Sequence, residues 1–261
     1  MVIFIFEVKY PISSLIMKKL LSFIILLLTL VPLVAQQEKP NTVKLNFYGF
    51  LFRTVSLQYE RTLNDNSAAL VHFGYTLPRS LPKSLFSIDT LTNNGSINQV
   101  SSAKFTGGIQ ITPEYRYYFK GEGNKGFYLG AYLRYANYGI SALALHRDDS
   151  FSMTKTYQYT GTWKSMNIGL IMGNQWQLGE NLTLDWWILG LQFGTNKISM
   201  TAAGDFSSTN KSEYIADVTA NFKDTKFLGG LEAGMTNTEA TLKFGFPSPG
   251  LRTGLCLGFR F

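Results

Sequence analysis

The last eleven residues of this 261-residue chain alternate between two classes of side chain without interruption. One row holds Leu251, Thr253, Leu255, Leu257, Phe259 and Phe261, and the other holds Arg252, Gly254, Cys256, Gly258 and Arg260. Because successive side chains of a β-strand point to opposite faces, this pattern predicts a strand with one apolar face and one polar or small face. Such a strand is typical of a barrel that crosses a membrane with its apolar row toward lipid.

The same alternation recurs along the rest of the chain. It predicts seven further strands, at 43–52, 54–63, 69–77, 105–120, 126–138, 165–178 and 182–197. In the last of these the alternation loses its phase at Ile188 and Leu189, where we expect a β-bulge. Pro113 has no N–H for a strand ladder, so we expect a bulge or a local break there as well. Together with the terminal strand, eight strands are enough to close a small barrel.

Short and long connections alternate between these strands. Polar turns are predicted at 64–67, 121–125 and 179–181, and long links at about 78–104, 139–156 and 198–249. In the last link, 213–222 predicts a short helix and 226–246 a hairpin, which either caps the barrel, the favoured interpretation, or joins its wall as two more strands. The predicted fold is therefore an all-β, antiparallel transmembrane β-barrel of eight strands, with ten as the alternative, and with long extracellular loops.

Charged residues within the strands fall mainly on the face opposite the apolar row. We predict a polar network in the lumen made of Lys44, Glu60, Glu114, Arg116, Arg134 and Arg252. A soluble barrel would have the reverse arrangement, with apolar side chains inside and charges outside. The inward acids could also form a charged pore or a carboxylate pair for acid–base chemistry. Because eight strands leave a lumen barely wide enough for side chains, and Tyr48, Tyr118, Tyr128 and Tyr132 are also expected inside, we favour a salt-bridged, largely plugged lumen.

The first 35 residues predict a secretory signal peptide. Basic residues at Lys18 and Lys19 precede an apolar run at 20–30, and Ala35 precedes a plausible cleavage site. The run is shorter than the ~20 residues that a spanning helix needs. Residues 1–16 are interpreted as a spurious upstream extension, 36–42 as a short periplasmic lead, and 43–261 as the barrel.

Composition excludes several other classes of protein. The formal net charge is +7, but no segment combines clustered Lys and Arg with interleaved aromatics, so we expect no nucleic-acid partner. Attraction to anionic lipid head groups explains the charge more simply. The single Cys256 offers no cysteine metal cluster, and the adjacent Asp148 and Asp149 lack the spaced acids of a calcium loop. We predict no cofactor and no metal.

The two histidines of the chain do not predict catalysis. His72 is expected to face inward, where it completes a polar network, and no serine is expected to pair with it on a strand. His146 lies in a predicted loop beside Asp148, Asp149 and Ser150, and adjacent loop residues rarely form a triad. We therefore predict that the protein is not an enzyme, with a lipid A-modifying hydrolase or acyltransferase as the alternative.

Several segments resemble a known family. They are Tyr59-Glu60-Arg61, the Pro-Glu-Tyr-Arg-Tyr-Tyr-Phe run at 113–119, the Gly-Phe-Tyr-Leu-Gly-Ala-Tyr run at 126–132, and the terminal strand. The resemblance is to an uncharacterised family of outer-membrane β-barrels common in Bacteroidetes, a domain of unknown function, and it implies no catalytic residues. The row Leu255, Leu257, Phe259 and Phe261 also resembles the C-terminal signal by which bacterial outer-membrane barrels are recognised for insertion.

We therefore expect a porin-like barrel in the outer membrane of a Gram-negative bacterium. Its expected partners are outer-membrane lipids, the barrel assembly machinery during insertion, and an unknown envelope or extracellular partner that contacts the loops. The expected role is structural or interactive, with a narrow solute channel and a lipid-modifying enzyme as alternatives.

Overall fold

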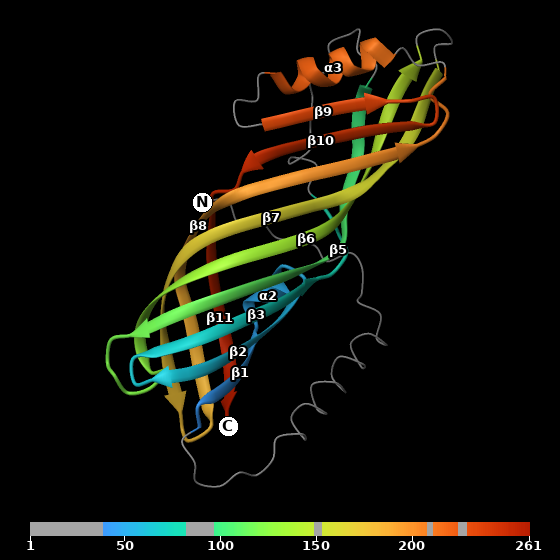
Figure 1. Ribbon diagram of the computed structural model, residues 1–261. Coiled ribbons are helices and arrows are strands. Elements are labelled where there is room, and N and C mark those ends of the chain that lie inside the picture. Colours follow the sequence, from blue (N-terminus) through green and yellow to red (C-terminus); the bar gives the residue numbers. More distant parts are fainter. Residues whose placement is uncertain (1–38, 82–96, 149–152, 208–210, 224–228) are drawn as a thin grey trace, which may run out of the picture. The chain divides into compact units, whose positions relative to one another are not determined.

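The computed structural model describes residues 39–81, 97–148, 153–207, 211–223 and 229–261 (Figure 1). The predicted signal peptide and upstream extension lie outside the described residues. Residues Pro40–Arg260 form one compact unit. Its strands are β1 (Asn41–Asn46), β2 (Thr54–Asn64), β3 (Ser67–Thr76), β4 (Arg79–Ser80), β5 (Ile97–Tyr118), β6 (Gly126–Asp148), β7 (Met153–Leu178), β8 (Leu182–Ala203), β9 (Gly229–Met235), β10 (Glu239–Pro247) and β11 (Gly250–Arg260). Its helices are α2 (Tyr48–Leu51) and α3 (Lys211–Lys223).

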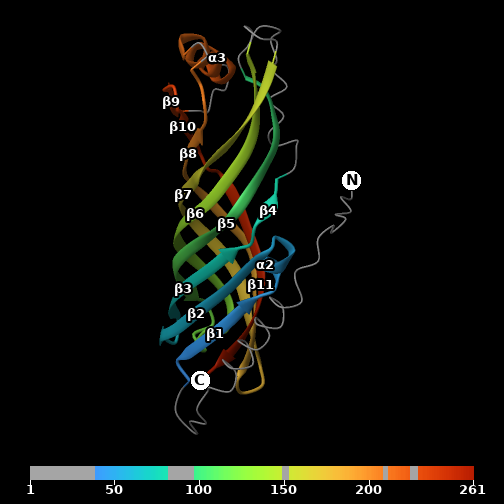
Figure 2. The ribbon, with the colours of Figure 1, turned by 90° about the vertical axis from the view of Figure 1, so that its right-hand side faces the viewer.

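Eight of these strands form a closed antiparallel ring (Figures 1 and 2). The order around it is β1, β2, β3, β5, β6, β7, β8 and β11, and β11 pairs with both β8 and β1. The prediction of an eight-stranded antiparallel ring is confirmed. Closure satisfies the backbone groups that an open sheet would leave at its edges. No helix in the described part of the chain is long and apolar enough to cross a membrane.

The strand β8 changes its partner along its length. Its first half, Leu182–Gln192, pairs with β11, and its second half, Thr195–Ala203, pairs with β10. The predicted hairpin at 226–246 is confirmed over its described residues as β9 and β10, which continue the sheet beyond the ring; 226–228 lie outside the described residues. The alternative of a ten-stranded barrel is wrong, because the ring closes through β11 without the hairpin.

The predicted long loops are wrong in large part, because β5, β6, β7 and β8 continue far past the ring (Figure 2). Here the inner faces pack into a second core around Tyr157, Phe206, Tyr214 and Val218, and α3 confirms the predicted helix. We call β9, β10, α3 and the strand ends beyond the ring the extension. The prediction stopped too early because the outward apolar row is interrupted there: Asn137, Gly139 and Ser141 follow Tyr135 on β6, and the outward Thr156, Gln158 and Thr160 of β7 are polar. His146 thus lies in β6 rather than in a loop, whereas Asp149 and Ser150 lie outside the described residues.

Two predicted irregularities have different outcomes. In β8, Leu189 pairs with Met172 and Trp187 with Gly173, so one extra residue, Ile188, forms the predicted bulge. The bulge keeps Trp187 and Gly190 both facing inward. Of the bulge or local break predicted at Pro113, the local break is confirmed, because Thr112 and Pro113 have no ladder partners in β6; there is no bulge, since the register of β5 with β6 is the same before and after it.

The predicted strand 43–52 is wrong in its second half. After β1, the N–H groups of Phe50, Phe52 and Arg53 bond to the carbonyls three residues earlier, which turns the chain into α2. Arg53 has a φ of 54°, a left-handed conformation that redirects the backbone into β2. Tyr48, expected inside the lumen, is therefore on α2 and 41% exposed. Its segment, Phe47–Phe52, is aromatic except at Gly49 and Leu51 and does not alternate between apolar and polar residues.

Candidate functional site

The outer face of the ring is an apolar belt. Large apolar side chains are exposed on each of its strands, among them Val43, Leu57, Phe73, Ile109, Leu129, Leu133, Met166, Ile168, Leu170, Leu191, Phe193, Leu251 and Leu257. Aromatic residues gather near the short turns, as Tyr59, Tyr117, Phe119, Phe127, Trp176 and Trp186 show. Of the predicted insertion signal, Leu255, Leu257 and Phe259 occupy outward positions of β11, while Phe261 follows the end of that strand.

The belt ends where the extension begins. On β7 the exposed outward residues are Met166, Ile168 and Leu170 within the ring, but Thr156, Gln158 and Thr160 beyond it. On β8, Thr195, Lys197 and Ser199 likewise follow the apolar Leu191 and Phe193. The same face of one strand therefore changes from apolar to polar at a defined height.

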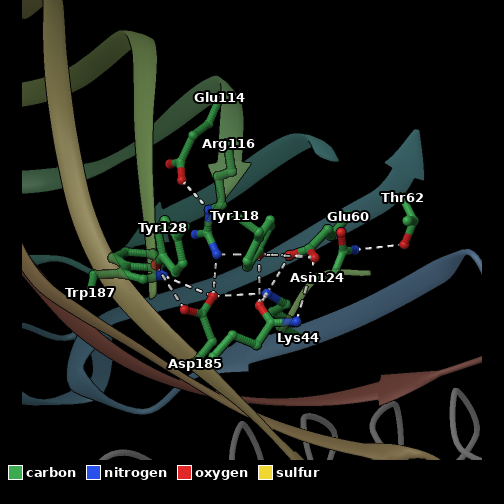
Figure 3. Close-up of polar contacts among 11 residues, drawn as sticks. Lys44, Glu60, Thr62, Glu114, Arg116, Tyr118, Asn124, Tyr128, Asp185 and Trp187 are labelled. Atoms are coloured by element: carbon green, nitrogen blue, oxygen red, sulfur yellow. Dashed lines mark hydrogen bonds and ion pairs between the residues drawn. The ribbon is translucent and has the colours of Figure 1, made fainter. Parts of the chain in front are cut away.

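The half of the lumen nearest the short turns, which we call its lower half, holds a buried network that we call the plug (Figure 3). It contains five charged side chains of zero solvent exposure: Lys44, Glu60, Glu114, Arg116 and Asp185. Lys44 Nζ bonds to a Glu60 carboxylate oxygen and lies 2.8 Å from Asp185 Oδ2. Arg116 lies 2.5 Å from Glu114 Oε1 and 2.7 Å from Asp185 Oδ2.

Neutral donors complete the plug. The Tyr128 hydroxyl donates to Asp185 Oδ1 over 2.8 Å, and Trp187 Nε1 donates to Asp185 Oδ2 over 3.2 Å. The Arg116 guanidinium lies 4.1 Å from the centre of the Tyr128 ring. Asp185 thus receives four donors from four strands, which meets the requirement that a buried charge be both paired and hydrogen-bonded. Inward glycines make room for these rings: a Cβ on Gly254 would come within 2.7 Å of Trp187.

The structure divides the six residues of the predicted network. Lys44, Glu60, Glu114 and Arg116 meet in the plug, whereas Arg134 and Arg252 lie above it and have no carboxylate partner among the described residues. Asp185, which holds the two cations of the plug together, was missing from the predicted set. The alternation in the sequence already places Asp185 on the inward face just before the bulge. Its contacts with Lys44 and Arg116, however, depend on the strand register around the ring.

Above the plug lies a partly open cavity of about 360 Å³. Arg252 and Trp187 line its floor, and Trp187 also bonds to Asp185, so this residue separates the cavity from the plug. Aromatic residues Phe105, Tyr138 and Trp163 contribute to the wall, and Tyr48 of α2 contributes to the rim. Among the described residues, no group of three or more potential metal ligands is present.

One contact in this cavity overturns an expectation. Ser56 Oγ is hydrogen-bonded to His72 Nε2, although no such pair on strands was predicted. Arg252 Nη2 lies 3.3 Å from His72 Nδ1, and an arginine can only donate. Nδ1 is then the acceptor, so Nε2 carries the proton and donates to Ser56. In this tautomer His72 cannot accept the serine proton, as a nucleophile's general base must.

Three comparisons place the chain among known proteins. A family model described as "Protein of unknown function (DUF3575)" matches residues 22–223. No curated protein matches the chain. Among solved structures, the outer membrane protease OmpT from Escherichia coli is similar at 9% sequence identity and a TM-score of 0.32, over 85% of this chain and 93% of that chain. That similarity is too distant to support a statement about activity.

Proposed function

The chain belongs to the DUF3575 family of proteins of unknown function, and from that starting point we propose that it is a small outer-membrane β-barrel with a sealed lumen. In this proposal the ring spans the membrane, the plug blocks conduction, and the extension contacts an envelope or extracellular partner. The observation that carries the proposal is the inverted distribution of side chains, with charges at zero exposure inside and an apolar belt outside.

The height of the belt supports a position within a bilayer. The outward apolar row runs from Phe127 to Tyr135 on β6 and from Met166 to Leu178 on β7, where Asn174 is its one polar residue. At ~3.3 Å per residue and a tilt of about 40°, these rows span roughly 20–30 Å, close to the ~25 Å apolar band of membrane barrels.

The edge of the belt supports contact with anionic head groups. Lys164 on β7 and Lys197 on β8 are both exposed and directly opposite each other in the ladder. Like charges in that position repel, and negatively charged lipid groups at the membrane surface would relieve the repulsion.

A sealed lumen predicts that the protein does not conduct. Reconstituted in planar bilayers, it is expected to give no steady current above that of the bare membrane, because Lys44, Arg116 and three carboxylates fill the lumen with Tyr118 and Tyr128 between them. Insertion is checked in the same preparation by protease protection of the ring. Stable single-channel steps from inserted protein would favour the narrow solute channel instead.

A lipid-modifying enzyme remains the second candidate because Ser56 and His72 are in contact. The contact with Arg252 leaves the proton of His72 on Nε2, so His72 cannot accept the proton of Ser56, which argues against an enzyme. We expect the lipid A mass spectrum to be the same in cells that express the unchanged protein, a Ser56→Ala/His72→Ala variant, or no protein. An acyl-chain change that requires both residues would replace the structural proposal with a hydrolase or acyltransferase.

A further inference from the structure

The cavity above the plug has the charge of an anion site. Arg79, Arg134 and Arg252 all line it, and its lining contains no aspartate or glutamate. The plug holds three carboxylates and two cations, and each of these carboxylates pairs with Lys44 or Arg116 rather than with an arginine of the cavity. The positive charge of the cavity is therefore not neutralised by an ion pair within the described structure.

Arg252 is the arginine of the cavity best placed to receive an anion. It is 8% exposed, and its Nη1 is buried with no hydrogen-bond partner. Its guanidinium lies over the rings of Tyr132 and Trp187, at 4.4 and 5.1 Å, so two aromatic faces hold it without supplying a counterion. An N–H group of a buried guanidinium that has no hydrogen-bond partner destabilises the folded protein, unless an acceptor bonds to it.

Arg134 supplies a second cation on the wall of the same cavity. Its Nη2 donates to Gln110 Oε1, which the Tyr138 hydroxyl also approaches at 3.3 Å. Guanidinium groups are well suited to carboxylate and phosphate oxygens, because their N–H groups can form paired hydrogen bonds with them.

The aromatic side chains that line the cavity indicate the chemistry of the part of the ligand that is not acidic. Phe105 lies 5.3 Å from the Tyr138 ring and 5.5 Å from the Trp163 ring, and Arg79 lies over Phe105 at 5.3 Å. This aromatic group offers faces for a flat or apolar body. The volume of about 360 Å³ lies at the lower end of the roughly 300–1,000 Å³ of small-molecule sites.

We propose that the cavity binds a small organic anion, with its carboxylate or phosphate group held by Arg252 and Arg134 and its ring or apolar body against Phe105, Tyr138 and Trp163. This site goes beyond the proposed function, since it does not require the plug to be sealed or the extension to have a partner.

Equilibrium dialysis of the full chain, folded in a zwitterionic detergent, tests the proposal with four probes. Benzoate and phenyl phosphate should bind at least tenfold more tightly than benzyl alcohol, and benzylamine should not bind measurably. The tighter of the two anions identifies the preferred acidic group. Equal binding of benzyl alcohol, or binding of benzylamine, would overturn the proposal.

Variants locate the site. Arg252→Gln and Arg134→Gln should each weaken binding of the preferred anion at least tenfold, whereas Arg61→Gln, an exposed arginine on β2, should change it less than twofold. Folding of each variant is checked by its heat-dependent shift in gel mobility. If a variant fails to fold, the four-probe comparison on the unchanged protein still decides. Unaltered anion binding in a folded Arg252→Gln variant would contradict the assignment.

Discussion

Replacing Arg116 by glutamine is expected to destabilise the barrel by about 3–5 kcal/mol, the range measured when one partner of a buried ion pair is removed. Arg116 contacts Glu114, Asp185 and, at 3.8 Å, Glu60. Without it, three buried carboxylates would share only Lys44. Urea-induced unfolding of the protein in lipid vesicles, followed by tryptophan fluorescence, measures the change in unfolding free energy.

Two matched variants sharpen this prediction. Arg61→Gln makes the same chemical change at an exposed position and should cost little, since exposed charges contribute about 0–1 kcal/mol. Asp185→Asn should be less costly than Arg116→Gln, because it leaves two cations facing Glu60 and Glu114. If Arg116→Gln costs no more than Arg61→Gln, the plug does not stabilise the ring.

Replacing Leu170 by arginine is expected to cost about 2–4 kcal/mol in a bilayer, the cost of an arginine on the lipid face near the midplane. Leu170 lies on β7, is 68% exposed, and pairs with Ala131 and Leu191 in the middle of the belt. Unfolding in vesicles measures this cost, with insertion checked by sedimentation with lipid.

The matched control is Leu182→Arg at the first residue of β8. Leu182 is also exposed, at 44%, but it lies beside the short turn, where an arginine can reach the membrane surface. Its replacement should cost about 0–1 kcal/mol. A soluble barrel would give small and similar costs at both positions, and that result would contradict a membrane-spanning ring.

Much of the ring could be predicted from the local alternation of residues in the sequence. Strict alternation along 251–261 predicted the terminal strand, and loss of phase at Ile188 predicted the bulge. The resemblance of several segments to a family of unknown function agrees with the matching family model. The local pattern failed where the alternation of apolar and polar residues was interrupted. Residues 139–148 and 153–156 belong to strands, but Gly139 and Ser141 on β6 and Thr156 on β7 interrupt the outward apolar row, and Phe47–Phe52 is apolar without alternating.

The sequence by itself determined most residues of the ring, apart from the second half of 43–52, and the face of the strand that each occupies, because the two-residue period of a strand is a local property. Only the tertiary structure decided which inward residues meet. Asp185 bonds to Lys44 across 141 positions, and Arg252 approaches His72 across 180. Such contacts depend on strand register and tilt around a closed ring, and a shift of register would change every partner while leaving the local pattern of each strand intact. For that reason one predicted network became two structures, an ion-paired plug and a cavity lined by arginines above it.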